Sequence, residues 1–140
     1  MREKHTEMCN CFIVALLLLC STVMLSGCRN ENIIEIVKRE SFYLNFTVEG
    51  NKVYIECELS VNNVAGKEVE VEFYAYFPDD VNSGLLKNER LKGYQKDKKT
   101  SKFFIPEGNK SIVIVFVGDF AGINKKHDRA LPKITIVNQR

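Results

Sequence analysis

Charge of one sign is what this sequence most clearly lacks. Lysine and arginine number 20 against 18 aspartates and glutamates, so the net charge is only +2. Such a balance gives no large excess of positive charge that could attract the phosphates of nucleic acid. We therefore predict no nucleic-acid partner. Tryptophan is absent, and no internal repeat, Gly/Ser-rich linker or low-complexity tract divides the chain after its first 28 residues.

The motifs of common catalytic chemistries are also missing. The sequence contains no Gly-x-Ser-x-Gly, Cys-x-x-Cys, His-Glu-x-x-His or phosphate-binding glycine loop. Of its two histidines, only His127 lies beyond the N-terminal segment. Asp79 and Asp80 suit a calcium ion, yet a solvated turn explains them more simply. We predict no metal, no cofactor and no enzymatic activity, and we keep an enzyme with an unrecognised site as an alternative.

What is present is the composition of one globular domain. The chain is 45% hydrophobic and 27% charged, a balance that excludes wholesale disorder. Its 140 residues are enough for a single domain with a sizeable core.

The N-terminal segment carries a targeting pattern. No charged residue occurs in 9–27, and 11–25 is mostly apolar. A bilayer-spanning helix needs about 20 apolar residues. The stretch is therefore short for a permanent anchor and has the length of the apolar region of a secretory signal. Because Arg2 and Lys4 supply a basic start, the pattern predicts a cleaved signal peptide over residues 1–27.

A four-residue motif ends this segment: Leu25, Ser26, Gly27 and Cys28. It resembles the lipobox of bacterial lipoprotein precursors, in which the thiol accepts a diacylglyceryl group and small residues give the signal peptidase access. The resemblance implies that Cys28 becomes the lipidated first residue of the mature chain, and two acyl chains give stable anchoring. A lipobox followed by one small β-rich domain resembles the small surface lipoproteins of Gram-positive bacteria, and this resemblance rests on the first 28 residues. An ordinary cleaved signal, or a buried apolar helix with a chance cysteine, is the alternative.

The cysteines agree with this interpretation. Of the five, Cys9, Cys11 and Cys20 would leave with the signal and Cys28 would carry lipid. Only Cys57 remains, so we expect no disulfide within the mature domain, although its compartment is oxidising. Cys57 lies on the apolar side of an alternating run, which predicts a small core residue rather than a nucleophile.

Period-2 alternation follows and predicts strands rather than helices. Residues 42–48 and 53–61 alternate on either side of Gly50 and Asn51, a pair typical of a β-hairpin turn. Residues 69–77 form a third alternating run. The side chains expected to face the core are Phe42, Leu44, Phe46 and Val48 in the first run, Val53, Ile55, Cys57, Leu59 and Val61 in the second, and Val69, Val71, Phe73, Ala75 and Phe77 in the third.

Shorter patterns predict the remaining elements. These are a strand covered on both faces at 111–117, a final strand at 134–137, weaker strands at 85–94 and 102–105, and either a strand or one helical turn at 33–37. About seven strands without a long helix predict an all-β fold over 33–140. The specific expectation is an immunoglobulin-like β-sandwich, with a small barrel as the competitor.

Glutamates restrict how the two longest runs can be arranged. Glu56 and Glu58 point outward from one strand, and Glu70 and Glu72 point outward from the other. Like charges directly opposite each other destabilise a sheet. We therefore predict that these two strands are not hydrogen-bonded neighbours and lie in different sheets.

A basic segment is the first candidate binding surface. Residues 84–102 carry seven lysines and arginines against two acids. Residues 28–32 would form the lipidated cysteine and a short tether, of which the last four residues span about 14 Å, close to the Debye length of ~8–10 Å. We predict that Lys96, Lys98 and Lys99 orient the domain against an anionic membrane.

The loop over residues 118–132 is the second candidate, because loops of this length are often functional. Its candidate binding residues are Phe120, Lys125, Lys126, His127 and Arg129, with Ile123 beside them. An apolar and basic surface suits an anionic headgroup, a polymer or an acidic peptide. A solvated loop without a ligand is the alternative.

These observations lead to one functional hypothesis and two alternatives. The first is a lipid-anchored protein on the extracytoplasmic face of the cell membrane, acting as a non-enzymatic binding module for a protein, peptide or envelope polymer. The second is an immunity lipoprotein that sequesters a lantibiotic-type bacteriocin. The third is the enzyme already mentioned.

Overall fold

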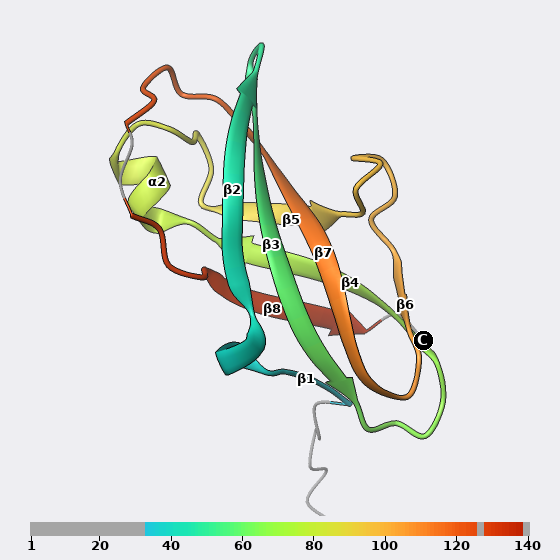
Figure 1. Ribbon diagram of the computed structural model, residues 1–140. Coiled ribbons are helices and arrows are strands. Elements are labelled where there is room, and N and C mark those ends of the chain that lie inside the picture. Colours follow the sequence, from blue (N-terminus) through green and yellow to red (C-terminus); the bar gives the residue numbers. More distant parts are fainter. Residues whose placement is uncertain (1–32, 126–127, 139–140) are drawn as a thin grey trace, which may run out of the picture. The chain divides into compact units, whose positions relative to one another are not determined.

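The computed structural model describes residues 33–125 and 128–138 (Figure 1). The predicted signal peptide, the predicted lipidation residue Cys28 and the tether lie outside these residues, as do Lys126 and His127. None of the helices in the described ranges is long and apolar enough to span a membrane.

Strands are the dominant regular structure of the described residues, and the helical elements among them are short, which confirms the all-β class. Along the chain the elements are β1 (Ile34–Ile36), η1 (Lys38–Glu40), β2 (Phe42–Glu49), β3 (Lys52–Asn63), β4 (Val69–Tyr76), α2 (Pro78–Asn82), β5 (Arg90–Tyr94), β6 (Phe103–Ile105), β7 (Gly108–Asp119) and β8 (Lys133–Asn138). The segment at 33–37, for which both a strand and a helical turn were open, contains the strand β1.

All strands belong to one antiparallel sheet in the order β1-β3-β7-β5-β4-β6, with β2 added to β3 and β8 added to β4. β3 and β4 are not neighbours, as the glutamates predicted. They do not lie in separate sheets, however, because β7 and β5 connect them through three residue pairs. Figure 1 shows β2, β3 and β7 crossing in front of β4, β5 and β8, so the sheet bends into a nearly closed barrel.

The predicted hairpin between β2 and β3 is confirmed. Glu49 pairs with Lys52, which leaves Gly50 and Asn51 as a two-residue turn. Gly50 has φ = 60°, as the first position of a type II′ turn requires, and glycine adopts this conformation without steric cost. The turn fixes which side chains of β3 enter the core.

The core contains the inward rows predicted for β3 and β4. Every second residue from Val53 to Val61 is fully buried, and so are Val71, Phe73 and Ala75. Phe73 meets Phe103 edge to face, with ring centroids 5.1 Å apart. Cys57 is a free, buried thiol, and burial raises its pKa to about 12. This environment keeps the thiol protonated and agrees with its predicted role as a core residue.

The prediction for β2 is wrong at two positions. Phe42 and Leu44 were expected in the core, but their exposed fractions are 55% and 45%. The register with β3 shifts between Tyr43 and Asn45, so Leu44 is the extra residue of a β-bulge. The bulge reverses the alternation, and Tyr43 rather than its neighbours packs against the core.

Lysines of the basic segment neutralise glutamates of β4. Lys102 Nζ lies 2.8 Å from Glu70 Oε1, and Lys92 Nζ lies 2.8 Å from Glu72 Oε1. The hydrogen bond from Lys92 holds the pKa of Glu72 below its usual range. Two of the positively charged residues between 84 and 102 therefore form ion pairs inside the domain, and glutamates of β4 balance their charge.

Candidate functional site

The turn between β2 and β3 brings the two predicted binding segments to the same end of the domain. On one side, Lys98 Nζ lies 3.2 Å from Glu49 Oε1 and 3.9 Å from the centroid of the Tyr54 ring. On the other side, the Phe120 amide donates a 2.9 Å hydrogen bond to the Asn51 carbonyl. We call this region, made of residues 49–52, 84–87, 95–100 and 119–125, the turn end.

Asp97 shapes the basic turn at 95–100. Its carboxylate accepts hydrogen bonds from the amides of Lys99 and Thr100, each 2.8 Å long, and another from the Thr100 hydroxyl. These hydrogen bonds hold the pKa of Asp97 below its usual range. The turn leaves Lys96 and Lys99 exposed. Lys98 is more restrained, because its ammonium contacts Glu49 and Tyr54.

The first part of the long loop is fixed by backbone hydrogen bonds to the segment before β5. The Ala121 amide donates to the Leu85 carbonyl at 2.9 Å, and the Ile123 amide donates to the Gly84 carbonyl at 3.0 Å. Gly84 has φ = +79°, and a Cβ there would lie only 2.8 Å from Ile123 Cδ1. Glycine is thus required both for the backbone conformation and for the close approach of Ile123.

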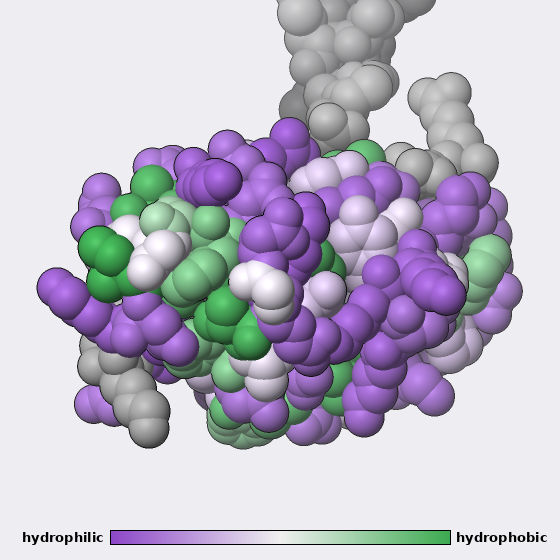
Figure 2. Space-filling view, turned by 90° about the horizontal axis from the view of Figure 1, so that it is seen from above, coloured by the Kyte–Doolittle hydropathy of each residue, from purple (hydrophilic) through white to green (hydrophobic). Residues whose placement is uncertain are grey.

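This arrangement presents apolar side chains at the surface. Ile123 is 48% exposed, Ala121 is exposed, and Phe120 is half-buried. Figure 2 looks onto this end and shows hydrophobic atoms gathered on the left, the side where Figure 1 draws α2 and the loop after β7. Lys87 and Lys125 are exposed on the same two segments. The turn end therefore combines the apolar and basic character predicted from the sequence.

The turn end lies opposite the point where the described chain begins. Ile34 pairs with Asn63 at one end of β3, whereas Lys52, at the other end of β3, forms a 2.6 Å ion pair with Asp119. A strand of this length spans roughly 37 Å. Lys96, Lys98 and Lys99 would reach a membrane near Ile34 only if the domain lay on its side.

Arg129 does not belong to this surface, and the prediction that its side chain contributes to an exposed basic surface of the loop is wrong. Its Nε donates a 2.8 Å hydrogen bond to Asp80 Oδ1, and both side chains are 6% exposed. The guanidinium also lies 4.2 Å from the centroid of the Phe46 ring. Burial beside this pair raises the pKa of Tyr43 to about 12, although the charge of Arg129 opposes the shift. Asp80 is therefore neither a solvated turn residue nor an exposed calcium ligand.

No local pattern in the sequence indicates the Asp80–Arg129 pair, because the two residues are 49 positions apart. Asp79, in contrast, is exposed as expected for a turn. Within 33–125 and 128–138, no group of three or more histidine, cysteine or acidic side chains is placed to hold a metal ion.

No protein-family model, curated protein or solved structure matches this chain. The function must be argued from its own residues. Two structural features indicate a binding surface. Ile123 and its neighbouring lysines form an exposed patch, and this patch lies at the end of the domain opposite Ile34.

Proposed function

We propose that this protein is a lipid-anchored lipoprotein on the extracytoplasmic face of the cell membrane, and that its β domain binds a partner protein through the turn end. The lipobox-like motif ending in Cys28 supports the anchor. The convergence of two exposed segments at the end remote from Ile34 supports the binding role, since it directs the surface away from the predicted tether.

The single observation that carries the binding role is the fixed exposure of Ile123. Its backbone is hydrogen-bonded to Gly84, and its side chain packs on that glycine yet stays 48% exposed. A preorganised apolar side chain loses little conformational freedom on binding. Because about half of the side chain is already covered, its complete burial by a partner would contribute about 1.5 kcal/mol to binding. This is half of the upper value for burying a large aliphatic side chain completely.

The lysines around Ile123 indicate the charge of the partner. Lys87 and Lys125 are exposed on the two segments that hold the isoleucine, and Lys96 and Lys99 are exposed on the basic turn. Complementary charges accelerate encounter and exclude wrong partners more than they add affinity. A partner that places an apolar side chain on Ile123 and acidic side chains around it fits this surface.

For the architecture, we propose a small barrel-like sandwich, the competitor of the immunoglobulin-like sandwich that the sequence favoured. It is supported by two crossing layers of strands around one core, joined in the described residues through β5 and β7. Layers that cross, rather than run nearly parallel, are typical of barrel-like sandwiches.

Metabolic labelling with an alkyne fatty acid tests the anchor. We expect the wild-type protein to be labelled and the Cys28→Ala variant to lose the label and accumulate as an uncleaved precursor, because the thiol is the acylation site. The Cys57→Ala variant is the matched control and should keep the label, since Cys57 is buried in the core. Labelling that survives in Cys28→Ala would contradict the lipoprotein assignment.

Site-specific photocrosslinking in intact cells tests the turn end. A photoreactive amino acid at position 123 should give a discrete crosslinked partner, while the same residue at position 64 should not. Val64 is the matched control because it is 58% exposed and its amide donates to the Ile33 carbonyl, at the opposite end. With the identified partner, Ile123→Asp should weaken binding roughly tenfold, or 1.4 kcal/mol, and Val64→Asp should leave it unchanged. Equal crosslinking at both positions would show that the turn end is not the binding surface.

A further inference from the structure

The barrel is left open where β1 and β8 approach each other. A groove of about 540 Å³ lies there, with Ile34, Glu35, Ile36 and Lys38 on one wall and Ile134, Thr135 and Ile136 on the other. We call it the seam groove. In the described residues, β1 is paired only with β3 and β8 only with β4. Each strand therefore presents an edge with unpaired backbone donors and acceptors to the same groove, which is a template for another strand.

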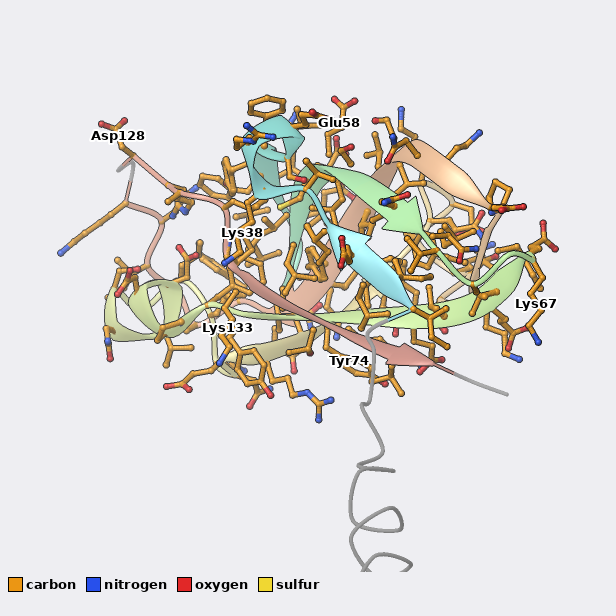
Figure 3. All side chains as sticks on the ribbon, turned by 90° about the horizontal axis from the view of Figure 1, so that it is seen from below. Lys38, Glu58, Lys67, Tyr74, Asp128 and Lys133 are labelled. Carbon is orange, nitrogen blue, oxygen red and sulfur yellow. The ribbon has the colours of Figure 1, made fainter. Side chains whose placement is uncertain are left out.

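The seam groove continues into a second hollow of about 540 Å³, which shares Lys38 and Ile134 with it and extends to Leu131 and Lys133. Its other lining residues are apolar or proline. Across the two hollows, two lysines, Lys38 and Lys133, face one acidic lining residue, Glu35 of the seam groove. Lys38 and Lys133 are exposed and form no ion pair with any residue in 33–125 or 128–138. Figure 3 shows both lysines at the same side of the domain, near the beginning of β8.

The strand directions restrict how the opening can be filled. Each ladder along the path from β1 through β3, β7, β5 and β4 to β8 is antiparallel. β1 and β8 therefore run in opposite directions, and one strand inserted between them must be antiparallel to one and parallel to the other. Antiparallel pairing is slightly more stable per residue, and β8 is the longer edge, with six residues against three in β1.

We propose that the seam groove binds an extended acidic peptide segment of a partner protein, which adds to β8 as an antiparallel strand. Alternate side chains of a strand point to opposite faces. Apolar side chains of the segment would enter the groove beside Ile36 and Ile134, and the intervening carboxylates would reach Lys38 and Lys133. This site is separate from the turn end and does not depend on the function proposed above.

A second copy of this chain fits the seam groove less well. Its own free β8 edge has the sequence Lys-Ile-Thr-Ile-Val-Asn, which contains no acidic residue. Pairing of two β8 strands would therefore satisfy backbone groups but leave Lys38 and Lys133 without counter-charges. An acidic segment satisfies the backbone groups and gives counter-charges to both lysines, which outnumber the one acidic lining residue, Glu35, and charge complementarity therefore favours it.

The test uses the full-length chain in detergent micelles and a fluorescent peptide with the sequence Glu-Val-Glu-Val-Glu-Val-Glu, capped at both ends. We expect saturable binding that weakens as salt rises. The double variant Lys38→Glu/Lys133→Glu should reduce affinity at least tenfold, whereas Lys67→Glu should not change it. Lys67 is the matched control because it is exposed and lies on the opposite side in Figure 3. Ile123→Asp should also leave this binding unchanged, which separates it from the turn end.

Hydrogen exchange supplies a second readout, which a purely electrostatic contact would not give. Binding of the peptide should slow exchange of the β8 amides that do not pair with β4, and a peptide N-methylated at alternate residues should bind more weakly. The proposal is overturned if the acidic peptide does not bind, if Lys67→Glu weakens binding as much as the double variant, or if β8 gains no protection. It is also overturned if β8 gains protection through self-association without any peptide.

Discussion

Replacing Asp80 with alanine is expected to destabilise the domain by about 3–5 kcal/mol, because it removes the carboxylate of a buried ion pair and leaves the Arg129 charge buried without it. Both side chains of the Asp80–Arg129 pair are 6% exposed. The backbone of Asp80 is equally engaged, since its carbonyl accepts hydrogen bonds from the Leu85 and Leu86 amides. Equilibrium unfolding in urea, monitored by circular dichroism, measures the loss.

Two further variants distinguish a buried ion pair from simple truncation. The double variant Asp80→Ala/Arg129→Leu removes both charges and should recover part of the lost stability, since apolar replacements of a buried pair are often neutral. Lys52→Ala removes one partner of the exposed pair with Asp119, whose side chains are 44% and 42% exposed. Exposed pairs contribute little to stability, because water and salt screen their charges. If Asp80→Ala costs no more than Lys52→Ala, the Asp80–Arg129 pair does not stabilise the fold as described.

Phe73→Ala should cost about 3–5 kcal/mol, the range for truncating a buried phenylalanine. Phe73 is fully buried in the centre of β4 and contacts the ring of Phe103 edge to face. Its removal leaves a cavity that neighbouring strands cannot fill without breaking their register. The midpoint of urea unfolding should fall strongly, with little change in the slope of the transition.

Tyr74→Ala is the control for Phe73, because the two residues are adjacent and face opposite sides of β4. Tyr74 is half-buried, its ring lies 4.2 Å from the Arg90 guanidinium carbon, and its hydroxyl donates to Glu72 Oε2. These outer contacts predict a much smaller loss than the buried ring of Phe73. Equal losses would mean that the register of β4 is not as described.

The parts of the fold that follow from local alternation could be predicted from the sequence. The rows from Val53 to Val61 and from Val69 to Phe77 are buried as expected, since a strand with one covered face must alternate. The hairpin turn at Gly50 was also predictable, because few residues adopt positive φ readily. The separation of β3 from β4 followed from the repulsion between their outer glutamates.

The parts that depend on contacts distant in sequence could not be predicted. The sequence around Leu44 alternates without interruption, but the bulge at this residue changes which side chains of β2 face the core. Arg129 resembles the exposed lysines around it, and only the position of Asp80 beneath it shows that it is buried. The seam groove arises because β1 and β8, the first and last strands of the described residues, lie at facing edges of the sheet.

For the candidate binding surface, the sequence identified the segments but not how they combine. Both the basic turn and the long loop contain the residues that meet at the turn end, including Lys98 and Phe120. Their meeting point is the β2–β3 turn, which carried no functional signal of its own. Lys126 and His127 lie outside the described residues, so their predicted part in binding stays a prediction.

The register of β3 with β7 determines when the chain can fold. Lys52 pairs with Asp119, 67 residues later in the sequence. The loop between them must close before either strand gains its partner, and topologies dominated by such distant pairs fold slowly. Until β7 has been synthesised, the hairpin of β2 and β3 exposes an apolar face and an unpaired edge. A chain in this state is prone to aggregation, because its apolar face and its unpaired edge stay uncovered until β7 pairs with β3.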